Sequence, residues 1–334
     1  MTDRSHLADA FLAQTAWGQA RRAPLAGDAS NRRYDRLTLP DTGETAVLMD
    51  APPEKGEDVR PFVRIANHLR DQGLSAPEIL AENAEQGFLL LEDLGDDLFA
   101  RVIPEHPALE MTLYEAATDA LVQVHQAPLP QLDRYGPRLM AEMAGLALSK
   151  YRTGIRGEPD EDLQRRFENH FEDILRLTTK GDTVLVQRDY HAENLLWLPD
   201  RTGVARVGLL DFQDARAGHR AYDLVSLLQD ARRDVPAGVE MQMIDRYIRA
   251  TGVDDHAFRT AYTVLGVQRN LRILGVFARL SLEYGKPFYV ELIPRVWAHL
   301  VRGLEHPSLA PVAETIRDAL PAPTPENLDR LRPA

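Results

Sequence analysis

The 334-residue sequence predicts an α+β, bilobal fold. A small β-rich lobe is expected over residues 1–94 and a larger, mainly helical lobe over residues 95–334. Two observations support this division. Up to residue 94, short apolar runs alternate with turn residues, as in β-strands. After residue 95, most apolar residues recur at helical spacing, and a predicted hairpin is embedded among the helices. A crevice between two such lobes is a common place for a nucleotide to bind.

The first lobe is expected to contain an opening helix, followed by strands and one further helix. Strands are predicted at 34–39 and 45–49, separated by the turn sequence PDTGE. Residues 61–72 place apolar side chains on one face of a helix that Gly73 would end. The run FLLL at 88–91 is expected to form a short buried strand.

The second lobe is expected to be built on long helices. Helices are predicted at 113–126, 162–177 and 257–284. One strand-rich region lies between them, with strands at 183–187, 195–198 and 206–210 and the turn PDRTG joining the last two. The proline-rich tail from Pro321 is expected to be loosely held.

Composition excludes several classes of protein. The sequence has no cysteine, which excludes disulfides and thiolate metal sites and favours an oxygen-bound ion such as Mg²⁺. No apolar run approaches the roughly 18–20 residues that cross a bilayer, and the N-terminus does not resemble a secretory signal. The net charge of −12 argues against non-specific binding to nucleic acid. We therefore expect a cytoplasmic protein without membrane, nucleic-acid or protein partners.

One stretch carries the strongest chemical signal. In VQRDYHAENLLW, Asp189 follows a predicted strand and lies five residues before Asn194; a predicted hairpin then leads to Asp211 in LLDFQ. Phosphoryl transfer needs an oriented acceptor hydroxyl and metal ions that neutralise phosphate oxygens. Asp189 could orient the hydroxyl and take its proton, and Asn194 and Asp211 could hold Mg²⁺. Alternatively, both aspartates are turn or cap residues at strand ends.

Two further segments are candidates for holding a nucleotide. The small-residue turn before the first strand could cover phosphates with its backbone, and arginines could add charge. Backbone groups at the junction between the lobes could pair with adenine. An ordinary β-turn and a plain linker are the alternatives. The candidate residues are Gly27, Asp28, Ser30, Arg32, Arg33, Glu92, Asp93 and Leu94.

The spacing D-x₄-N, then a hairpin, then D-F resembles the catalytic and metal motifs of protein kinases and aminoglycoside phosphotransferases. The phrases GDASNRRY, LLLEDLGDDL, VQRDYHAENLL and LLDFQDARAGHRAYDLVSLL further resemble the anomeric N-acetylmuramate/N-acetylglucosamine 1-kinases of the aminoglycoside phosphotransferase family. The resemblance implies a protein-kinase-like fold with ATP as co-substrate and Mg²⁺ as cofactor. It also implies Asp189 as base, preceded by Arg188, and Asn194 and Asp211 as metal ligands. Members of that family phosphorylate the anomeric hydroxyl of an amino sugar recycled from peptidoglycan.

The sequence departs from these families at several positions. Met49 and Asp50 stand where a kinase-like lysine is expected, and Gln187 replaces a histidine common in aminoglycoside kinases. Asn31 and Asp35 stand where the sugar kinases more often have aromatic residues. An aminoglycoside or other small-alcohol kinase and a non-catalytic nucleotide-binding protein are therefore kept as alternatives.

Four residues are candidates for contacting the acceptor. Glu193 and His191 could accept hydrogen bonds from sugar hydroxyls, or His191 could brace the loop. Arg216 and Arg220 could bind the lactyl carboxylate of N-acetylmuramate, or pair with surface acids such as Asp214.

Two features of the segment after Asp211 complete the predictions. Asp223 either supports the catalytic loop or faces solvent. Only residues 212–220 separate Asp211 from the next predicted helix, which leaves no long segment to dock a polypeptide substrate.

Overall fold

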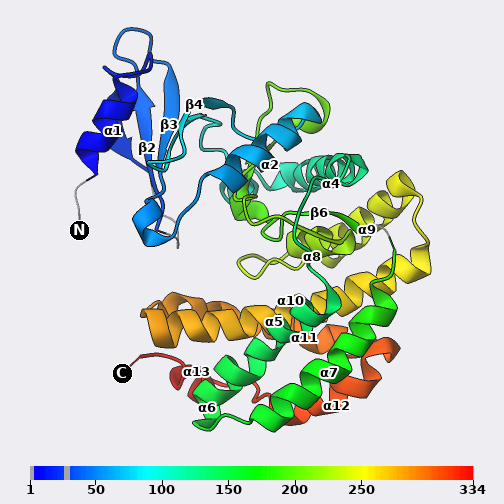
Figure 1. Ribbon diagram of the computed structural model, residues 1–334. Coiled ribbons are helices and arrows are strands. Elements are labelled where there is room, and N and C mark those ends of the chain that lie inside the picture. Colours follow the sequence, from blue (N-terminus) through cyan, green and yellow to red (C-terminus); the bar gives the residue numbers. More distant parts are fainter. Residues whose placement is uncertain (1–3, 26–30, 182, 334) are drawn as a thin grey trace. The chain divides into compact units, whose positions relative to one another are not determined.

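The computed structural model describes residues 4–25, 31–181 and 183–333, and the chain divides into two compact units (Figure 1). The first unit comprises Met1–Ala127 and Ala192–Ala215, and the second comprises Pro128–His191 and Arg216–Ala334. The lobe boundary expected between residues 94 and 95 stays a prediction. None of the helices in the described ranges is both long enough and apolar enough to cross a membrane.

The first unit combines a five-stranded antiparallel sheet, in the order β1-β2-β3-β5-β4, with helices and a separate two-stranded hairpin, β7-β8. Its elements are α1 (Ser5–Leu12), β1 (Arg21–Pro24), β2 (Arg33–Thr38), β3 (Thr45–Asp50), α2 (Arg60–Asp71), β4 (Ile79–Asn83), β5 (Phe88–Glu92), α3 (Phe99–Glu105), α4 (Glu110–Gln126), β7 (Leu195–Trp197) and β8 (Val207–Leu209). The strands and helices predicted from the sequence in this unit are confirmed, with shifts of one to three residues at their ends.

Helix α1 covers one face of the five-stranded sheet (Figure 1). Side chains in a strand alternate between the two faces, so Ala46 and Leu48 of β3 point to the same side. They pack in one cluster with Phe88 of β5 and Phe11 of α1, and the two phenylalanine rings stack at 5.7 Å between centroids. The opening helix expected from the sequence thus forms part of the hydrophobic core.

The second unit is mainly helical and contains one short strand pair, β6-β9. Its elements are α5 (Pro137–Leu146), a π-helical turn (Ala147–Arg152), α6 (Thr153–Arg156), α7 (Glu161–Thr178), β6 (Thr183–Val186), β9 (Arg216–His219), α8 (Ala221–Leu228), α9 (Ala237–Thr251), α10 (Asp255–Tyr284), α11 (Ile293–Gly303), α12 (Ala310–Ala319) and α13 (Pro325–Asp329). The long helices predicted at 162–177 and 257–284 are confirmed as α7 and α10.

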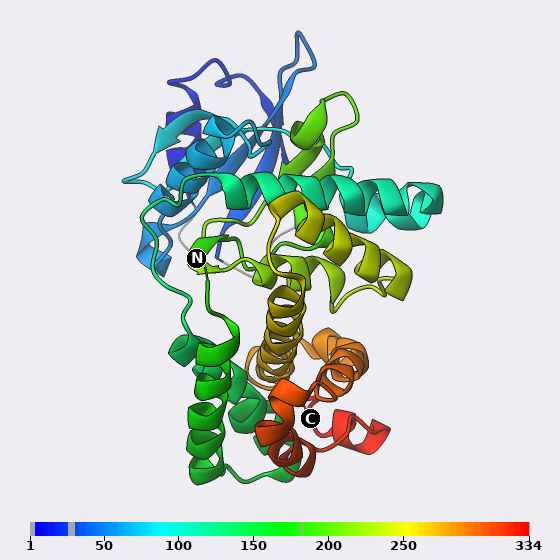
Figure 2. The ribbon, with the colours of Figure 1, turned by 90° about the vertical axis from the view of Figure 1, so that its right-hand side faces the viewer.

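Helix α10 is the centre of the second unit. It packs against α5, α8 and α11, and Figures 1 and 2 show neighbouring helices running along it. A helix that is apolar around much of its circumference is suited to such a buried position. Gly275 of α10 permits close approach to α5, because a Cβ at this position would lie 2.3 Å from the backbone carbonyl carbon of Leu146.

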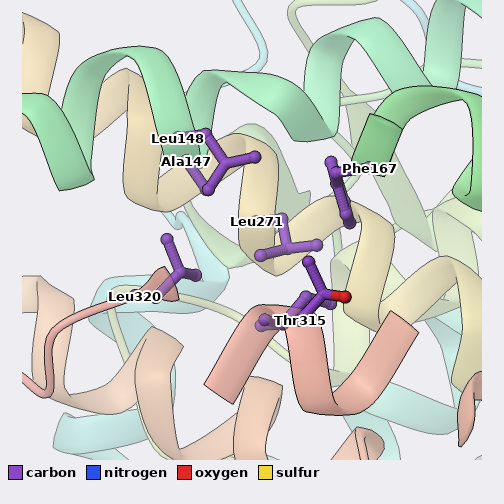
Figure 3. A pocket seen from close by; sticks show the side chains of 7 residues that line it. Ala147, Leu148, Phe167, Leu271, Thr315 and Leu320 are labelled. Atoms are coloured by element: carbon purple, nitrogen blue, oxygen red, sulfur yellow. The ribbon is translucent and has the colours of Figure 1, made fainter. Parts of the chain in front are cut away.

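An apolar pocket lies within this helical core (Figure 3). Its lining residues are Ala147, Leu148, Phe167, Leu271, Thr315, Ile316 and Leu320. Among these seven residues only Thr315 has a polar side chain, and none is charged. The pocket therefore offers no groups suited to a nucleotide or a sugar phosphate, and we interpret it as imperfect packing between helices.

One expectation from the sequence was wrong in the second unit, and one strand was missed. The strands predicted at 183–187, 195–198 and 206–210 form as β6, β7 and β8, but β6 pairs with β9, a strand that the sequence did not indicate. The segment RAGH of β9 lacks an apolar run, so its pairing depends on tertiary structure. The tail is also not loosely held: Leu331 is fully buried, and the Tyr151 hydroxyl donates to the Pro321 carbonyl oxygen at 2.8 Å.

The close approach at Gly275 yields a stability prediction. We expect Gly275→Ala to lower the free energy of unfolding by about 1–3 kcal/mol, because α10 and α5 must separate to admit the methyl group. Gly238→Ala in α9 is the matched control, since its added Cβ would meet no described atom within 4 Å. It should change stability by no more than about 0.5 kcal/mol. Urea unfolding of both variants checks this, and equal effects would contradict the packing argument.

Candidate active site

The loop that contains Asp189 is fixed by a buried carboxylate on the following helix. Strand β6 ends at Val186, and the next two backbone N–H groups, of Gln187 and Arg188, both donate to the side chain of Asp223 in α8, at 2.6 Å and 2.9 Å. Asp223 is fully buried. Of the two roles considered for Asp223, supporting the loop is the one the structure bears out.

The backbone of this loop adopts an uncommon conformation. Arg188 has a φ of 74°, in the left-handed region that a residue with a Cβ rarely occupies. Its carbonyl oxygen accepts a hydrogen bond from Ser226 of α8 at 3.2 Å. Both peptide groups of Arg188 are therefore attached to α8. Strained backbone held by its surroundings is often found at functional sites, and here it directly precedes Asp189.

Asp189 lies in a positively charged environment within the second unit. Burial raises the pKa of its carboxyl, but Arg272, His191, Arg188 and Arg269 outweigh that effect, so the pKa is lowered. The side chain is therefore a carboxylate at neutral pH. A carboxylate with a low pKa is a weak base, which suits a reaction in which the base chiefly orients the acceptor hydroxyl.

Two tyrosines and an arginine lie beside this loop, and no motif in the sequence indicates them. The hydroxyls of Tyr135 and Tyr222 lie 3.3 Å apart, and the Tyr222 hydroxyl accepts from Arg272 at 3.4 Å. The guanidinium of Arg188 lies over the Tyr135 ring, 5.7 Å from its centroid. Burial raises the pKa of the Tyr135 hydroxyl strongly, so this hydroxyl stays protonated.

Polar residues in the middle of α10 form a buried network with α8. Arg269 donates to the carbonyl oxygen of Gln229 and to the Ser226 hydroxyl, and Asn270 donates to the Gln229 side chain at 2.9 Å. In the sequence, the segment GVQRNLRIL lies within the long helix predicted at 257–284, and its polar residues received no role there. Four polar residues within five positions of such a helix were the signal that could have pointed to this network.

The first unit places the other two candidate residues together. In the hairpin, Leu195 pairs with Leu209, so Asn194 immediately before β7 lies beside the residues that follow β8. The Asn194 carbonyl oxygen accepts from the Leu210 N–H at 3.0 Å, and the Asn194 side-chain amide lies 3.4 Å from an Asp211 carboxylate oxygen. Asp211 also has a positive φ, of 57°, and accepts from the Gln213 side chain at 2.6 Å.

This pair fits a hard cation that keeps several non-protein ligands. Mg²⁺ prefers oxygen donors and is commonly held by one or two protein side chains together with phosphate oxygens and water. Asn194 and Asp211 carry an amide and a carboxylate at adjoining ends of one hairpin; the Asn194 amide nitrogen faces the Asp211 carboxylate in this structure, so the amide would turn to present its oxygen to the ion. Within the described ranges, no group of three or more acidic or histidine side chains could hold a metal ion by itself.

The phosphate-covering candidates are only partly described. Gly27, Asp28 and Ser30 lie outside the described residues. Arg32 forms an ion pair with Glu57 at 2.9 Å, and Arg33 is exposed at the start of β2. The two residues of β3 that stand where a kinase-like lysine is expected have other roles. Met49 is fully buried, and Asp50 pairs with Arg4 at 2.9 Å.

The side chains at the end of β5 are engaged in ion pairs of the first unit. Glu92 pairs with Arg70 of α2 and with Arg201, and Asp93 pairs with Arg36 of β2 at 2.7 Å. The carboxylates therefore hold this segment in place, and the Glu92 N–H donates to the Glu78 carbonyl oxygen at 2.8 Å.

The candidates for acceptor contacts are in different environments. Glu193 is exposed, whereas His191 is buried and its pKa is lowered to about 4, first by burial. His191 is therefore neutral at physiological pH. Arg216 is half-buried in β9, opposite Val186, and Arg220 forms a side-chain hydrogen bond with Tyr247.

The fold and these two groups of residues define a kinase-like protein. The chain belongs to the phosphotransferase enzyme family, whose model matches residues 21–262. This confirms the family resemblance and the expectation of a kinase.

Characterised relatives align over nearly the whole chain. A protein of Caulobacter vibrioides is 38% identical, covering 92% of this chain and 94% of its own length. One of Pseudomonas aeruginosa is 33% identical, covering 93% of each chain. Both are named N-acetylmuramate/N-acetylglucosamine kinase.

Solved structures confirm the kinase-like α+β fold. The ethanolamine kinase of Plasmodium vivax has a TM-score of 0.59 at 12% identity and covers 90% of this chain and 85% of its own. An aminoglycoside phosphotransferase of Streptomyces rimosus, solved with ADP and streptomycin, has a TM-score of 0.53 at 17% identity, covering 81% and 99%. At these identities the likeness concerns the fold alone.

The Asp223 contacts yield a prediction for activity. Asp223→Asn replaces one acceptor oxygen with a donor that faces a backbone N–H, so we expect the loop to loosen and kcat to fall roughly ten-fold or more. Steady-state kinetics check this, and an unchanged kcat would contradict the proposed support of the loop.

The same variant tests the protonation of Asp223. Burial, together with the charge of Asp189, raises its pKa to about 7, although two backbone N–H groups oppose the shift. Because this lies above the value of about 3.9 expected when unfolded, the folded protein binds the proton more tightly. The resulting stabilisation is complete below the unfolded pKa and is lost as pH rises through about 7. The stability of wild type relative to Asp223→Asn should therefore decrease between about pH 4 and about pH 7 in denaturant titrations, and should level off above that range.

Proposed function

We propose that the protein transfers the γ-phosphoryl group of ATP to the anomeric hydroxyl of N-acetylmuramate and N-acetylglucosamine. The observation that carries this proposal is the alignment with kinases of these two sugars over more than nine-tenths of this chain. The motif containing Asp189, Asn194 and Asp211 supplies the residue types that the reaction needs. The sugar 1-phosphate produced would enter nucleotide-sugar synthesis, as expected for recycling of peptidoglycan.

In the proposed reaction, Asp189 accepts a hydrogen bond from the anomeric hydroxyl and takes its proton. A bond forms between the anomeric oxygen and the γ-phosphorus, and the bond from that phosphorus to the bridging oxygen breaks, which releases ADP. The lowered pKa of Asp189 keeps it ionised and ready to accept the hydroxyl hydrogen. The attachment of the Arg188 peptide groups to α8 restricts the orientation of the carboxylate that follows.

Asn194 and Asp211 are the proposed ligands of Mg²⁺. When bound, the ion neutralises charge on the phosphate oxygens. The chain's own contribution is a pair of oxygen donors on one hairpin, held by the β7–β8 register and by the Asn194 carbonyl contact with Leu210. The packing of Phe212 against Phe62 of α2, with ring centroids 4.8 Å apart, further restrains the residue next to Asp211.

The nucleotide is proposed to contact two segments of the first unit. The backbone of Glu92, Asp93 and Leu94 would pair with adenine, while Arg32, Arg33 and the turn containing Gly27, Asp28 and Ser30 would cover the phosphates. The Arg32–Glu57 ion pair at 2.9 Å already uses part of one guanidinium. We therefore assign Arg33, which is exposed, the larger share of any direct phosphate contact.

The acceptor is proposed to contact Glu193, His191, Arg216 and Arg220. A neutral His191 can accept as well as donate a hydrogen bond, which suits a sugar hydroxyl or the adjacent loop. We infer a cytoplasmic location, because the helices described give no membrane span and ATP is a cytoplasmic co-substrate. No nucleic acid, membrane or protein partner is proposed.

Two substitutions separate the roles of the acidic residues. We expect Asp189→Asn to reduce kcat by at least about 10²-fold, in the range of losses for general-base contributions, with Mg-ATP binding retained. Asp211→Ala should instead weaken Mg²⁺-dependent nucleotide binding. Calorimetric titration with Mg-ATP, beside kinetics, checks both. Near-normal turnover by Asp189→Asn would exclude it as the base, and an unchanged Mg²⁺ requirement in Asp211→Ala would exclude it as a ligand.

The acceptor is tested by phosphorus NMR of Mg-ATP reactions with N-acetylmuramate, N-acetylglucosamine and kanamycin in parallel. We expect a sugar 1-phosphate signal coupled to the anomeric proton in the first two reactions. Phosphorylated kanamycin alone would assign the protein to the aminoglycoside kinases. No phosphorylated acceptor, with Mg-ATP still bound, would favour a nucleotide-binding protein without turnover, the alternative raised by Met49.

A further inference from the structure

Arg272 is a half-buried arginine whose hydrogen-bonding capacity is largely unused by the described residues. It lies near the middle of α10, and the single hydrogen bond it makes within the described ranges is the long one to the Tyr222 hydroxyl, at 3.4 Å. A guanidinium has five N–H donors. Its guanidinium forms no ion pair with any described acid; the acid that acts on it electrostatically is Asp189.

Other arginines of the same unit show the ordinary arrangement. Arg259 of α10 pairs with Asp255 at 2.9 Å, Arg295 with Asp234 at 2.6 Å and Arg302 with Glu240 at 2.8 Å. Arg269, one turn before Arg272, is almost fully buried and donates to Gln229 and Ser226. Arg272 differs from all of these, because its partly accessible donors remain available to a bound molecule.

The position of Arg272 relates it to the acceptor. Among the charged groups that act on Asp189, Arg272 has the largest effect in lowering its pKa. The base must contact the acceptor hydroxyl for proton transfer, at hydrogen-bonding distance. The contacts agree with this: Arg272 donates to the Tyr222 hydroxyl, which lies 3.3 Å from the Tyr135 hydroxyl, and the Tyr135 ring lies against the guanidinium of Arg188, the residue directly before Asp189. Arg272 is therefore close to the loop of the proposed base, where the acceptor sugar must lie.

We propose that Arg272 binds the lactyl carboxylate of N-acetylmuramate and so distinguishes this sugar from N-acetylglucosamine. This inference rests on the proposed function, because it names a specificity-determining residue for that acceptor. The two sugars differ by the lactyl ether, which carries the only carboxylate on the acceptor. A planar guanidinium can bind a carboxylate through two parallel hydrogen bonds, and partial burial strengthens such a pair.

Arg272 is favoured over the two arginines selected from the sequence. Arg220 already forms a side-chain hydrogen bond with Tyr247. Arg216 lies in β9 opposite Val186, and the charged groups with the largest effects on Asp189 are Arg272, His191, Arg188 and Arg269. Contact with the transferring phosphoryl group is a different role for Arg272, and it would affect both sugars equally.

Arg272→Met tests the proposal through the ratio of the two sugars. We expect kcat/KM for N-acetylmuramate to fall by about 10- to 100-fold relative to that for N-acetylglucosamine, the loss expected for a charge-assisted hydrogen bond. The relative loss should appear mainly in KM for N-acetylmuramate. Any change in Asp189 basicity affects both sugars and cancels in the ratio.

Three further variants sharpen the test. Arg272→Lys keeps the charge but not the planar fork, so it should recover part of the preference for N-acetylmuramate. Arg259→Met removes a surface arginine of the same helix and should leave the ratio unchanged. Arg216→Met tests the alternative that Arg216, another proposed acceptor contact, binds the carboxylate instead. If Arg272→Met unfolds, as judged by thermal melting, Arg272→Gln is measured in its place, since it can still bond to Tyr222.

The outcomes separate this proposal from the proposed function. If wild type phosphorylates neither sugar, the proposed function fails. If wild type phosphorylates both and folded Arg272→Met leaves their ratio unchanged, the proposed function stands and the role of Arg272 is overturned. An equal fall for both sugars would assign Arg272 to the reaction centre, and a changed ratio in Arg216→Met alone would assign the carboxylate to Arg216.

Discussion

The structure of the catalytic loop depends on one buried carboxylate. Asp223 accepts the backbone N–H groups of Gln187 and Arg188 and thereby fixes a left-handed residue directly before Asp189. Without such partners, this conformation would cost of order 1–3 kcal/mol and the loop would relax. Burying a carboxylate is itself unfavourable, and the raised pKa of Asp223 records that cost. The two hydrogen bonds offset it, and Ser226 of the same helix completes the attachment of Arg188.

The two groups of functional residues are positioned by different physical means. The Asp189 loop is held by side chains of α8 and α10, through hydrogen bonds buried in an otherwise apolar helical core. These bonds restrain the side chains they join, because breaking a hydrogen bond in a low-dielectric environment is costly; Arg269 Nε and Asn270 Oδ1 are buried without a partner among the described residues. Asn194 and Asp211 are instead brought together by strand register, which sets their neighbours within the first unit without any buried charge pair.

The choice of acceptor is separate from the fold. Proteins named for ethanolamine and for aminoglycosides share this architecture at 12–17% identity, so the architecture by itself does not select a substrate. Selection must come from side chains near the base. In this protein Asp189, the proposed base, lies in an arginine-rich environment, and a guanidinium with available donors suits an acidic acceptor better than a polycationic one. The overall net charge of −12 gives no such information, because most of it lies elsewhere on the chain.

The sequence by itself determined the α+β class, most helices and strands, and the motif that contains the three proposed catalytic and metal-binding residues. These follow from local periodicity, turn residues and fixed spacing along the chain, as for α10 and for Asp189, Asn194 and Asp211. Only the tertiary structure decided the pairing of β9 with β6, the anchoring of the tail by Tyr151 and Leu331, and the role of Asp223. The tertiary structure also points to Arg272, because its proposed role depends on its contact with Tyr222 and its position near Asp189 rather than on its neighbours in sequence. Periodicity records which side of an element is buried, but contacts between residues distant in sequence are set by packing.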